Sequence, residues 1–277
     1  MRRRALLIRF LQESPFQPAT DYWRSIEIDE VVERGLPEGR GIDIGCGDGH
    51  LMAIVVAAAR APREIVGIDL DPAEVRSAAR SGAYERLHVA PADRIPEPDG
   101  SFDWAFSNST LEHIPELEGT LAEVGRLLRP GGTFIATVPS HEFHECLAGP
   151  LWGDRSHYLD AIDARTAQLR YLSPSEWREA GARAGLELVT SDPYLTAAEV
   201  RRWETLSRFT AGLLYAATRG RRRPIEIQRS LGLRHSWIRM PRFLAFPLAV
   251  LLAGRVRGNP ADPNGCLYLV FRQTRTT

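Results

Sequence analysis

The chain has 277 residues, of which 44% are hydrophobic and 25% are charged. These values are ordinary for a folded globular protein and exclude a disordered or collagen-like chain. The 35 acidic residues are balanced by 35 basic residues, all of them Arg. Because the sequence contains no Lys, catalysis by a Schiff-base Lys and phosphate binding by a P-loop Lys are excluded.

The zero net charge conceals a segregation of charge along the chain. Residues 191–264 contain 13 Arg and five acidic residues, and residues 1–12 contain four Arg and no acid. The body between them, 13–190, is therefore acidic. A basic appendage of this kind suggests a surface for an anionic partner or a contact with the acidic body.

The cysteines and the N-terminus favour a cytoplasmic location. Cys46, Cys146 and Cys266 are far apart and odd in number, which fits neither a disulfide framework nor a zinc ribbon. The basic N-terminal segment has an apolar run that Arg9 interrupts, so it does not resemble a signal peptide. No run reaches the roughly 18 uninterrupted apolar residues of a membrane span.

Between residues 41 and 138 short apolar runs alternate with helical patterns, which is typical of βαβ units and a parallel sheet. Asp71 and Pro72 provide an N-cap and a first-turn Pro for one of the helices. We expect strands at 41–44, 64–69, 87–89, 102–106 and 133–138, and helices at 51–60, 72–82 and 115–128.

The second half contains two further strands and a long insertion. Ser173 and Glu176 form a capping box for a helix to about Ala184, a strand follows at 186–190, and the alternation at 266–271 predicts a closing strand. The segment between these strands is much longer than a usual α/β connection.

We therefore predict an α/β fold with a doubly wound, seven-stranded sheet and a helical, basic and apolar insertion before the last strand. The predicted parts are an N-terminal basic helical cap (1–40), a ligand-binding domain (41–190), the insertion (191–264) and the final strand of the domain (265–277).

The strongest local signal is the loop Asp43-Ile-Gly45-Cys-Gly47-Asp-Gly49 after the first strand. Glycines let the backbone turn tightly and approach a ligand, and Asp69 ends the next strand at the spacing from which a carboxylate binds ribose hydroxyls. The glycine at the sixth position of a dinucleotide fingerprint, G-x-G-x-x-G, is replaced by His50, and an acid precedes the loop. A carboxylate there disfavours pyrophosphate and suits a ligand with a cationic amino-acid end, which indicates S-adenosylmethionine.

With these residues the chain resembles the class I S-adenosylmethionine-dependent methyltransferases of the type 11 group, whose fold is Rossmann-like. The resemblance is dense over about 40–140, thins to about 190 and resumes at the final strand. It is carried by the segments Asp43–Gly49, Asp69–Asp71, Ile95–Asp103, Ser107–His113 and Leu128–Gly132.

The resemblance implies roles for individual residues. The three loop glycines, Gly45, Gly47 and Gly49, would line the methionine moiety, with Asp43 holding the loop or approaching the amino group through water. Asp69, followed by Leu70, would bind the ribose, and Asn108 would lie beneath the sulfonium. The family's adenine-binding Asp is replaced by Pro91, so Asp93 and the Ala92 N–H are the expected substitutes. Cys46 is expected to be a packing residue and Asp71 a helix cap.

Methyl transfer from a sulfonium requires alignment of the acceptor, and a hydroxyl acceptor also requires a general base. Past the fifth strand lie His141 and His144, which are the first and second candidates for that base. The alternative is that each only forms hydrogen bonds in its loop. Glu112 and His113 could equally brace a helix start or touch a substrate. No cluster of carboxylates and His suggests a metal.

The insertion bears on the acceptor. Apolar stretches at 209–217 and 243–253 are flanked by Arg, and Arg also flanks the apolar run near the N-terminus. Such segments suit the interface of an anionic membrane, so 205–257 could form a peripheral membrane contact. The alternative is a soluble lid packed on the core. Nucleic-acid binding is disfavoured, because the aromatic residues lie within apolar runs.

The sequence therefore predicts an enzyme that O-methylates a hydrophobic or lipid-linked acceptor, such as a glycan, at the cytoplasmic membrane face. Two alternatives stay open: a soluble methyltransferase acting on a small secondary metabolite, and a non-catalytic partner protein that binds S-adenosylmethionine.

Overall fold

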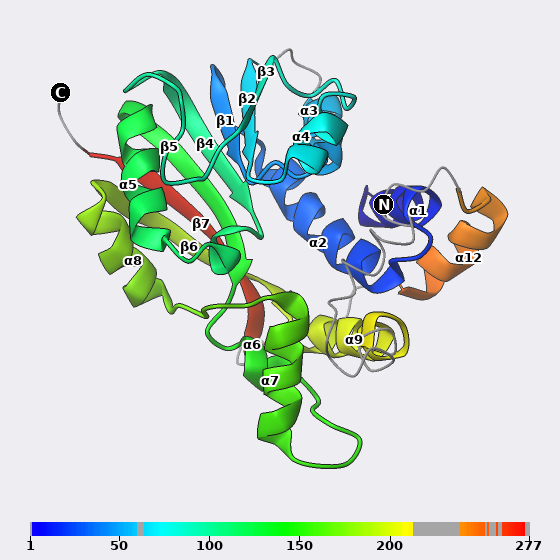
Figure 1. Cartoon of the computed structure of the whole chain (residues 1–277). Helices are drawn as coiled ribbons and strands as arrows, with labels where there is room; N and C mark the ends of the chain where they lie inside the picture. The colour runs from blue at the N-terminus through cyan, green and yellow to red at the C-terminus, as the bar shows by residue number, and fades with distance from the viewer. Residues whose placement is uncertain are drawn as a thin grey trace. The chain divides into compact units, whose positions relative to one another are not determined.

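A computed structural model describes residues 2–59, 64–212, 239–252, 254, 259 and 262–274 (Figure 1). These residues form two compact units. The first unit comprises 1–30, 142–168 and 195–265, and the second comprises 31–141, 169–194 and 266–277.

The second unit contains a seven-stranded sheet of order β3-β2-β1-β4-β5-β7-β6. β7 runs antiparallel to β5, whereas the pairs of β1 with β2 and β4, of β2 with β3 and of β4 with β5 are parallel. The strands are β1 (Gly41–Ile44), β2 (Ile65–Asp69), β3 (Arg86–Val89), β4 (Phe102–Asn108), β5 (Leu128–Pro139), β6 (Leu186–Thr196) and β7 (Asn264–Gln273).

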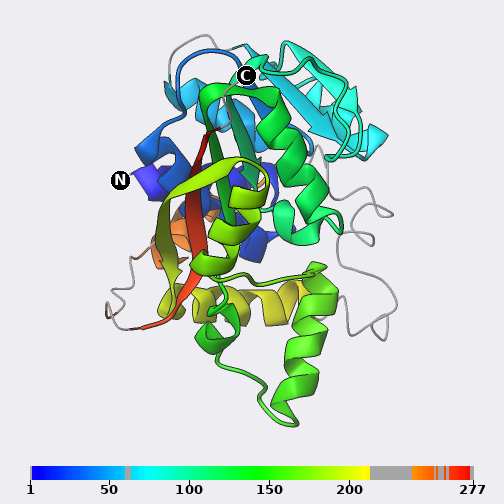
Figure 2. The ribbon, with the colours of Figure 1, turned by 90° about the vertical axis from the view of Figure 1, so that its left-hand side faces the viewer.

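The helices of this unit cover both faces of the sheet. The chain steps outward from β1 to β3 in one direction and from β4 to β5 in the other, so right-handed crossovers place their helices on opposite faces. Figure 1 shows α3 and α4 on one side and α5 and α8 on the other, and Figure 2 shows α5 and α8 side by side. These elements are α3 (His50–Ala59), α4 (Pro72–Ala78), the short η1 (Leu111–His113), α5 (Leu117–Leu127) and α8 (Pro174–Arg183).

The predicted α/β fold, with its doubly wound seven-stranded sheet, is confirmed, and so are the Asp71 cap and the Ser173–Glu176 capping box. The boundaries differ most at three places, one of which is the strand expected at 186–190, because it extends to Thr196. The helix expected to reach residue 82 ends at Ala78, and the strand expected at 133–138 starts at Leu128. In β5 the Pro-Gly-Gly segment bulges between Leu128, which pairs with Phe102, and Thr133, which pairs with Trp104, so β5 holds three more residues than β4 between these two pairs.

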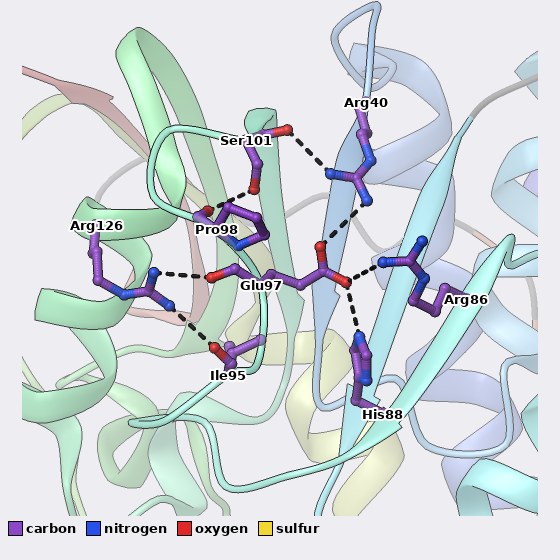
Figure 3. Close-up of polar contacts among 8 residues, drawn as sticks. All are labelled: Arg40, Arg86, His88, Ile95, Glu97, Pro98, Ser101 and Arg126. Atoms are coloured by element: carbon purple, nitrogen blue, oxygen red, sulfur yellow. Dashed lines mark hydrogen bonds and ion pairs between the residues drawn. The ribbon is translucent and has the colours of Figure 1, made fainter.

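A buried carboxylate holds the amino ends of the strands together (Figure 3). Glu97 is 5% exposed. It accepts hydrogen bonds from His88 Nε2 (2.8 Å), Arg86 Nη1 (3.1 Å) and Arg40 Nη2 (3.3 Å). Burial raises the pKa of Glu97, but the His88 hydrogen bond and the two guanidinium groups outweigh it and lower the pKa overall. The loop after β3 is thereby fastened to the starts of β1 and β3.

The first unit is helical. Its aromatic contacts join three elements, because Trp23 and Trp203 meet edge to face at 5.3 Å between ring centroids and each also contacts Phe143 at 5.9 Å. The elements are α1 (Arg2–Glu13), most of α2 (Pro18–Arg34), α6 (Phe143–Cys146), α7 (Arg155–Thr166), α9 (Ala197–Ser207), the π-helical η2 (Arg208–Gly212) and α12 (Arg242–Leu252).

Only part of the predicted insertion lies within the described residues. The apolar stretch expected at 243–253 forms α12, whereas the Arg cluster at 219–223, most of the stretch at 209–217, and Arg255 and Arg257 lie outside them. No helix among the described residues is both long enough and apolar enough to cross a bilayer.

The Glu97 network generates a stability prediction. Glu97→Gln should lower the free energy of unfolding by about 2 kcal/mol, because it leaves three donors without their buried charged acceptor. Urea unfolding at pH 7 measures the loss. Glu118→Gln is the matched control, since Glu118 pairs with Arg183 at an exposed site and should cost at most about 0.5 kcal/mol. Equal losses in the two variants would contradict the role assigned to Glu97.

A second prediction concerns Asp21, which is 2% exposed and bonded to Ser14 Oγ at 2.5 Å. Burial raises its pKa to about 8. A raised pKa stabilises the fold at low pH and loses that contribution as the pH rises towards 8. The stability of Asp21→Asn relative to the wild type should therefore grow between pH 5 and 8, by up to about 1.4 kcal/mol per pH unit. Parallel pH profiles of unfolding free energy would show that Asp21 does not titrate in this range.

Candidate active site

The glycine loop joins β1 to α3 at the carboxyl edge of the sheet, beside the point where the strand order reverses. Gly45 N and Cys46 N both donate to Ile68 O, at 2.9 and 2.8 Å, which fastens the loop to the end of β2. The pKa of the Cys46 thiol is raised far above its usual range by burial and by Asp43 and Asp69. Cys46 is therefore a packing residue and not a thiolate nucleophile.

The three loop glycines have positive φ angles of 77°, 53° and 75°, but different surroundings. A Cβ at Gly45 would lie 2.3 Å from Thr110 Cγ2, and one at Gly49 would lie 2.8 Å from the Tyr84 ring. Nothing lies within 4 Å of the Cβ position of Gly47. Gly45 and Gly49 thus permit close internal packing, whereas the backbone at Gly47 faces open space.

The Asp69 carboxylate connects the glycine loop to the start of α4. Its Oδ2 accepts from Gly47 N and its Oδ1 accepts from Asp71 N, both at 2.9 Å. Burial raises its pKa, and the two backbone N–H groups oppose that rise. Each carboxylate oxygen has two lone pairs, so both could accept a further hydrogen bond from a diol.

Asp43 lies beneath the loop and is 5% exposed. Its Oδ2 accepts a 2.6 Å hydrogen bond from the hydroxyl of Tyr84. The pKa of Asp43 is raised to about 7. Burial is the largest cause of this rise, the Tyr84 hydrogen bond opposes it, and the charge of Asp69 adds to it. A carboxyl group with this pKa changes charge near neutral pH.

The turn after β4 lies against the glycine loop through Thr110 and Gly45. Asn108, 8% exposed, accepts from Thr137 Oγ1 at 3.2 Å. Ser109 has a φ of 46°, and its N–H donates to Thr137 O (3.0 Å) and to Thr137 Oγ1 (3.2 Å). Thr137 on β5 therefore holds this turn in a conformation that non-glycine residues rarely adopt.

The remaining predicted donor residues follow β2 and β3. Leu70 is 71% exposed directly after Asp69, and Val89, at the end of β3, is 53% exposed. Ala92 packs partly buried against the core, and Asp93 lies against α5, where its Cβ is 3.2 Å from the Cβ position of Gly119. Apolar surface and a carboxylate thus occur together at this edge of the second unit.

The two predicted bases fall in different units. His141 is an exposed residue of the second unit, and its Nδ1 lies 3.4 Å from Ser140 Oγ. His144 belongs to the first unit, where Nε2 lies 3.0 Å from Asp163 Oδ1 on α7 and the backbone oxygen accepts from Arg155. Of the two, only His144 has a carboxylate hydrogen-bonded to its ring.

Glu112 and His113 belong to η1, whose conformation is held from a distant segment. Leu169 N donates to Glu112 O at 3.0 Å, and the Arg170 guanidinium donates to the backbone oxygens of Leu111 (2.7 Å) and Ile114. These contacts hold the backbone of η1, and the two roles considered for the Glu112 and His113 side chains stay predictions.

Three residues of the site carried no sequence signal. Tyr84, Thr137 and Asp163 contact predicted residues that lie 41, 29 and 19 positions away. No motif spacing links them, although a Tyr before β3 and a Thr near the end of β5 stand where the topology brings strand ends together. Among the described residues there is no group of three or more His, Cys, Asp or Glu side chains arranged to hold a metal ion.

Comparison with known proteins shows that the chain is similar to methyltransferases. Residues 42–136 match the family profile of a methyltransferase domain. An uncharacterized methyltransferase from Mycobacterium sp. (strain JLS) is 30% identical over 191 residues, which are 64% of this chain and 72% of the relative. The ubiquinone biosynthesis O-methyltransferase of Aromatoleum aromaticum is 30% identical over 159 residues, which are 55% of this chain and 66% of the relative.

The matched region is only part of many relatives. Five curated relatives match the chain over 39% to 66% of their own length. A solved structure from Thermotoga maritima, described as a methyltransferase and possible histamine N-methyltransferase, has a TM-score of 0.57 and 18% identity. The superposition covers 98% of this chain and 99% of that one, so the two share the fold.

The contrast among the glycines generates a binding prediction. Gly47→Ala should weaken binding of S-adenosylmethionine at least tenfold, because its methyl group would enter the open space where the resemblance places the ligand. Gly82→Ala is the matched control, since Gly82 also has a positive φ (72°) and open surroundings but lies outside the loop. Both variants should lose about 1 kcal/mol of stability, and calorimetric titration separates them. Equal affinities in the two variants would place the ligand elsewhere.

Proposed function

The chain belongs to the S-adenosylmethionine-dependent methyltransferases, and from that premise we propose that it O-methylates a hydrophobic or lipid-linked acceptor, such as a glycan, at a membrane surface. The observation that carries the donor half of this proposal is the Asp69 carboxylate bound to Gly47 N and Asp71 N. It sets an acceptor of diol hydrogen bonds beside the open backbone at Gly47.

The residues of this edge fit the donor. The open space at Gly47 is a cradle that a Cβ would fill. Asp43 supplies negative charge for the amino group of the donor, and the exposed Leu70 offers apolar surface to its adenine ring. When bound, S-adenosylmethionine supplies a methyl group already activated by its sulfonium. Asp69 and the glycine loop would orient it, so that the protein's remaining task is to align the acceptor and exclude water.

A hydroxyl acceptor must lose its proton as the new carbon–oxygen bond forms. We assign this proton to His144, because the 3.0 Å contact with Asp163 Oδ1 fixes the orientation of its ring, whereas His141 is exposed and its Nδ1 lies 3.4 Å from Ser140 Oγ. The sequence ranks these two residues in the opposite order, and the Asp163 contact is the reason for our preference.

The acceptor half of the proposal rests on α12. Its inner residues Ala245, Ala249 and Leu252 are buried, and it packs against α1, where Met240 N also donates to Gln12 O. Its outer residues are large, apolar and exposed, namely Phe243, Leu244, Phe246, Val250 and Leu251. Exposed Arg residues lie on both helices and next to them, at Arg4, Arg9, Arg239 and Arg242. Apolar side chains rimmed by Arg suit the interface of an anionic bilayer.

The first experiment titrates S-adenosylmethionine and S-adenosylhomocysteine into the wild type and Asp69→Ala by calorimetry. Micromolar binding that is lost in the variant supports the donor site. Folded wild type that binds neither ligand would contradict the proposal. Binding without turnover on hydroxylated lipids, lipid-linked glycans or small metabolites would favour the non-catalytic partner protein instead.

The choice of base is tested by turnover once an acceptor is found. His144→Ala should lower kcat by about 10²–10⁴, the usual range for a general base, with donor affinity unchanged. Asp163→Asn should lower kcat less, and His141→Ala should leave kcat within about threefold. A larger loss in His141→Ala than in His144→Ala would reverse the assignment.

Membrane contact is tested by co-sedimentation with phosphatidylglycerol vesicles. The double variant Phe243→Ser/Leu251→Ser should bind at least about 100-fold more weakly, because each side chain contributes about 1.5–3 kcal/mol when buried in an apolar phase and about 1.4 kcal/mol corresponds to a tenfold change. Val189→Ser is the control, since Val189 is also exposed but lies on β6. A wild type that does not bind these vesicles would leave a soluble enzyme acting on small molecules.

A further inference from the structure

The ring of Tyr84 fills a slot formed by two glycines. A Cβ at Gly49 would lie 2.8 Å from Tyr84 Cε2, and a Cβ at Gly67 would lie 2.9 Å from Tyr84 Cδ1 and Cε1. The ring therefore occupies space that glycines on β2 and at the start of α3 leave empty. This packing fixes where the hydroxyl can point.

The Tyr84 hydroxyl points to Asp43 on β1, with 2.6 Å between its oxygen and Asp43 Oδ2. The other titratable groups beside this pair are Asp69, Asp48 and the Cys46 thiol, which burial keeps neutral. All three are acids, so among the groups that act on it Tyr84 is the one that favours the ionised carboxylate.

We propose that Tyr84 is a positioning residue of the donor site, whose hydroxyl holds the Asp43 carboxylate beneath the glycine loop and favours its ionised form, so that tight donor binding extends to a lower pH than it would without this hydroxyl. The inference rests on the proposed donor site, because it assumes that the ligand's amino group lies near Asp43. Tyr84 itself does not touch the ligand in this proposal.

The direction of the pH dependence follows from the surroundings of Asp43. Burial raises its pKa to about 7, and the Tyr84 hydrogen bond acts against this rise. Below that pH Asp43 is neutral and does not attract an ammonium group, so binding should strengthen as the pH rises through about 7. Without the Tyr84 hydroxyl the pKa rises further, and the same strengthening requires a higher pH.

The experiment titrates S-adenosylhomocysteine, which carries the same amino-acid end, into the wild type and Tyr84→Phe from pH 6 to pH 8.5. Phenylalanine keeps the ring in its slot. At each pH the Kd of Tyr84→Phe is divided by the Kd of the wild type, and this ratio cancels any titration of the ligand itself. We expect the ratio to peak at about 10 near pH 7 to 7.5 and to fall towards 1 at pH 8.5.

Two further variants serve as controls. Tyr158→Phe also removes a 2.6 Å hydrogen bond from a tyrosine hydroxyl to a carboxylate, that of Glu204, but lies in the first unit. Its ratio should stay near 1 at every pH. In an Asp43→Asn background, where no charge can change, Tyr84→Phe should have an effect that is small and independent of pH.

The outcomes separate this inference from the proposed function. A wild type that binds, together with a ratio that is constant across the pH range, would show a purely structural Tyr84 and overturn the inference while leaving the donor site in place. A folded wild type that binds at no pH would overturn both. Thermal unfolding of each variant confirms that the comparison is made on folded protein.

Discussion

The hydrogen bonds of one carboxylate organise the carboxyl edge of the second unit. Asp69 ends β2 and accepts from the backbone of the glycine loop on one side and from the start of α4 on the other. The positive φ of Gly47 lets its N–H point toward Asp69. The glycine loop lies close to Asp69 because Gly45 N and Cys46 N donate to Ile68 O, which is on the same strand as Asp69. The carboxylate that we propose for ribose binding thus also holds the glycine loop in place.

Much of this arrangement could be predicted from the sequence, because it depends on local chemistry. Glycines before a helix, an acid at the end of the next strand and alternating apolar runs specify the strands, the order of helices and the donor loop. The contacts that the sequence did not predict are those between side chains that are far apart in the chain. Tyr84 reaches Asp43 through a slot left by Gly49 and Gly67, and no period or spacing in the sequence records that contact. Asp163 escaped prediction for the same reason.

The start of β5 shows how tertiary pairing changes a local preference. Pro-Gly-Gly after a helix is a strong stop signal, but the strand already begins at Leu128, which pairs with Phe102 of β4, and the Pro-Gly-Gly segment forms a bulge before the pairing resumes at Thr133. The two ends of the sheet also differ in their electrostatics. At the amino ends of the strands, Glu97 accepts from two guanidinium groups and from His88, whereas at the carboxyl edge the buried Asp43 and the half-buried Asp69 accept from neutral donors. The first arrangement stabilises a carboxylate, and the second leaves one ready to meet a cation.

The sheet order has a consequence for synthesis on the ribosome. β7 lies between β5 and β6, although it follows both in the sequence. Until it emerges, the edge of β5 has no partner and β6 has no neighbour in the sheet. Residues 197–263 must be translated in between, which takes roughly 3–13 s at about 5–20 residues per second. During that interval the nascent chain exposes an open strand edge of the kind that promotes aggregation, so the length of the insertion sets how long a chaperone would have to shield it.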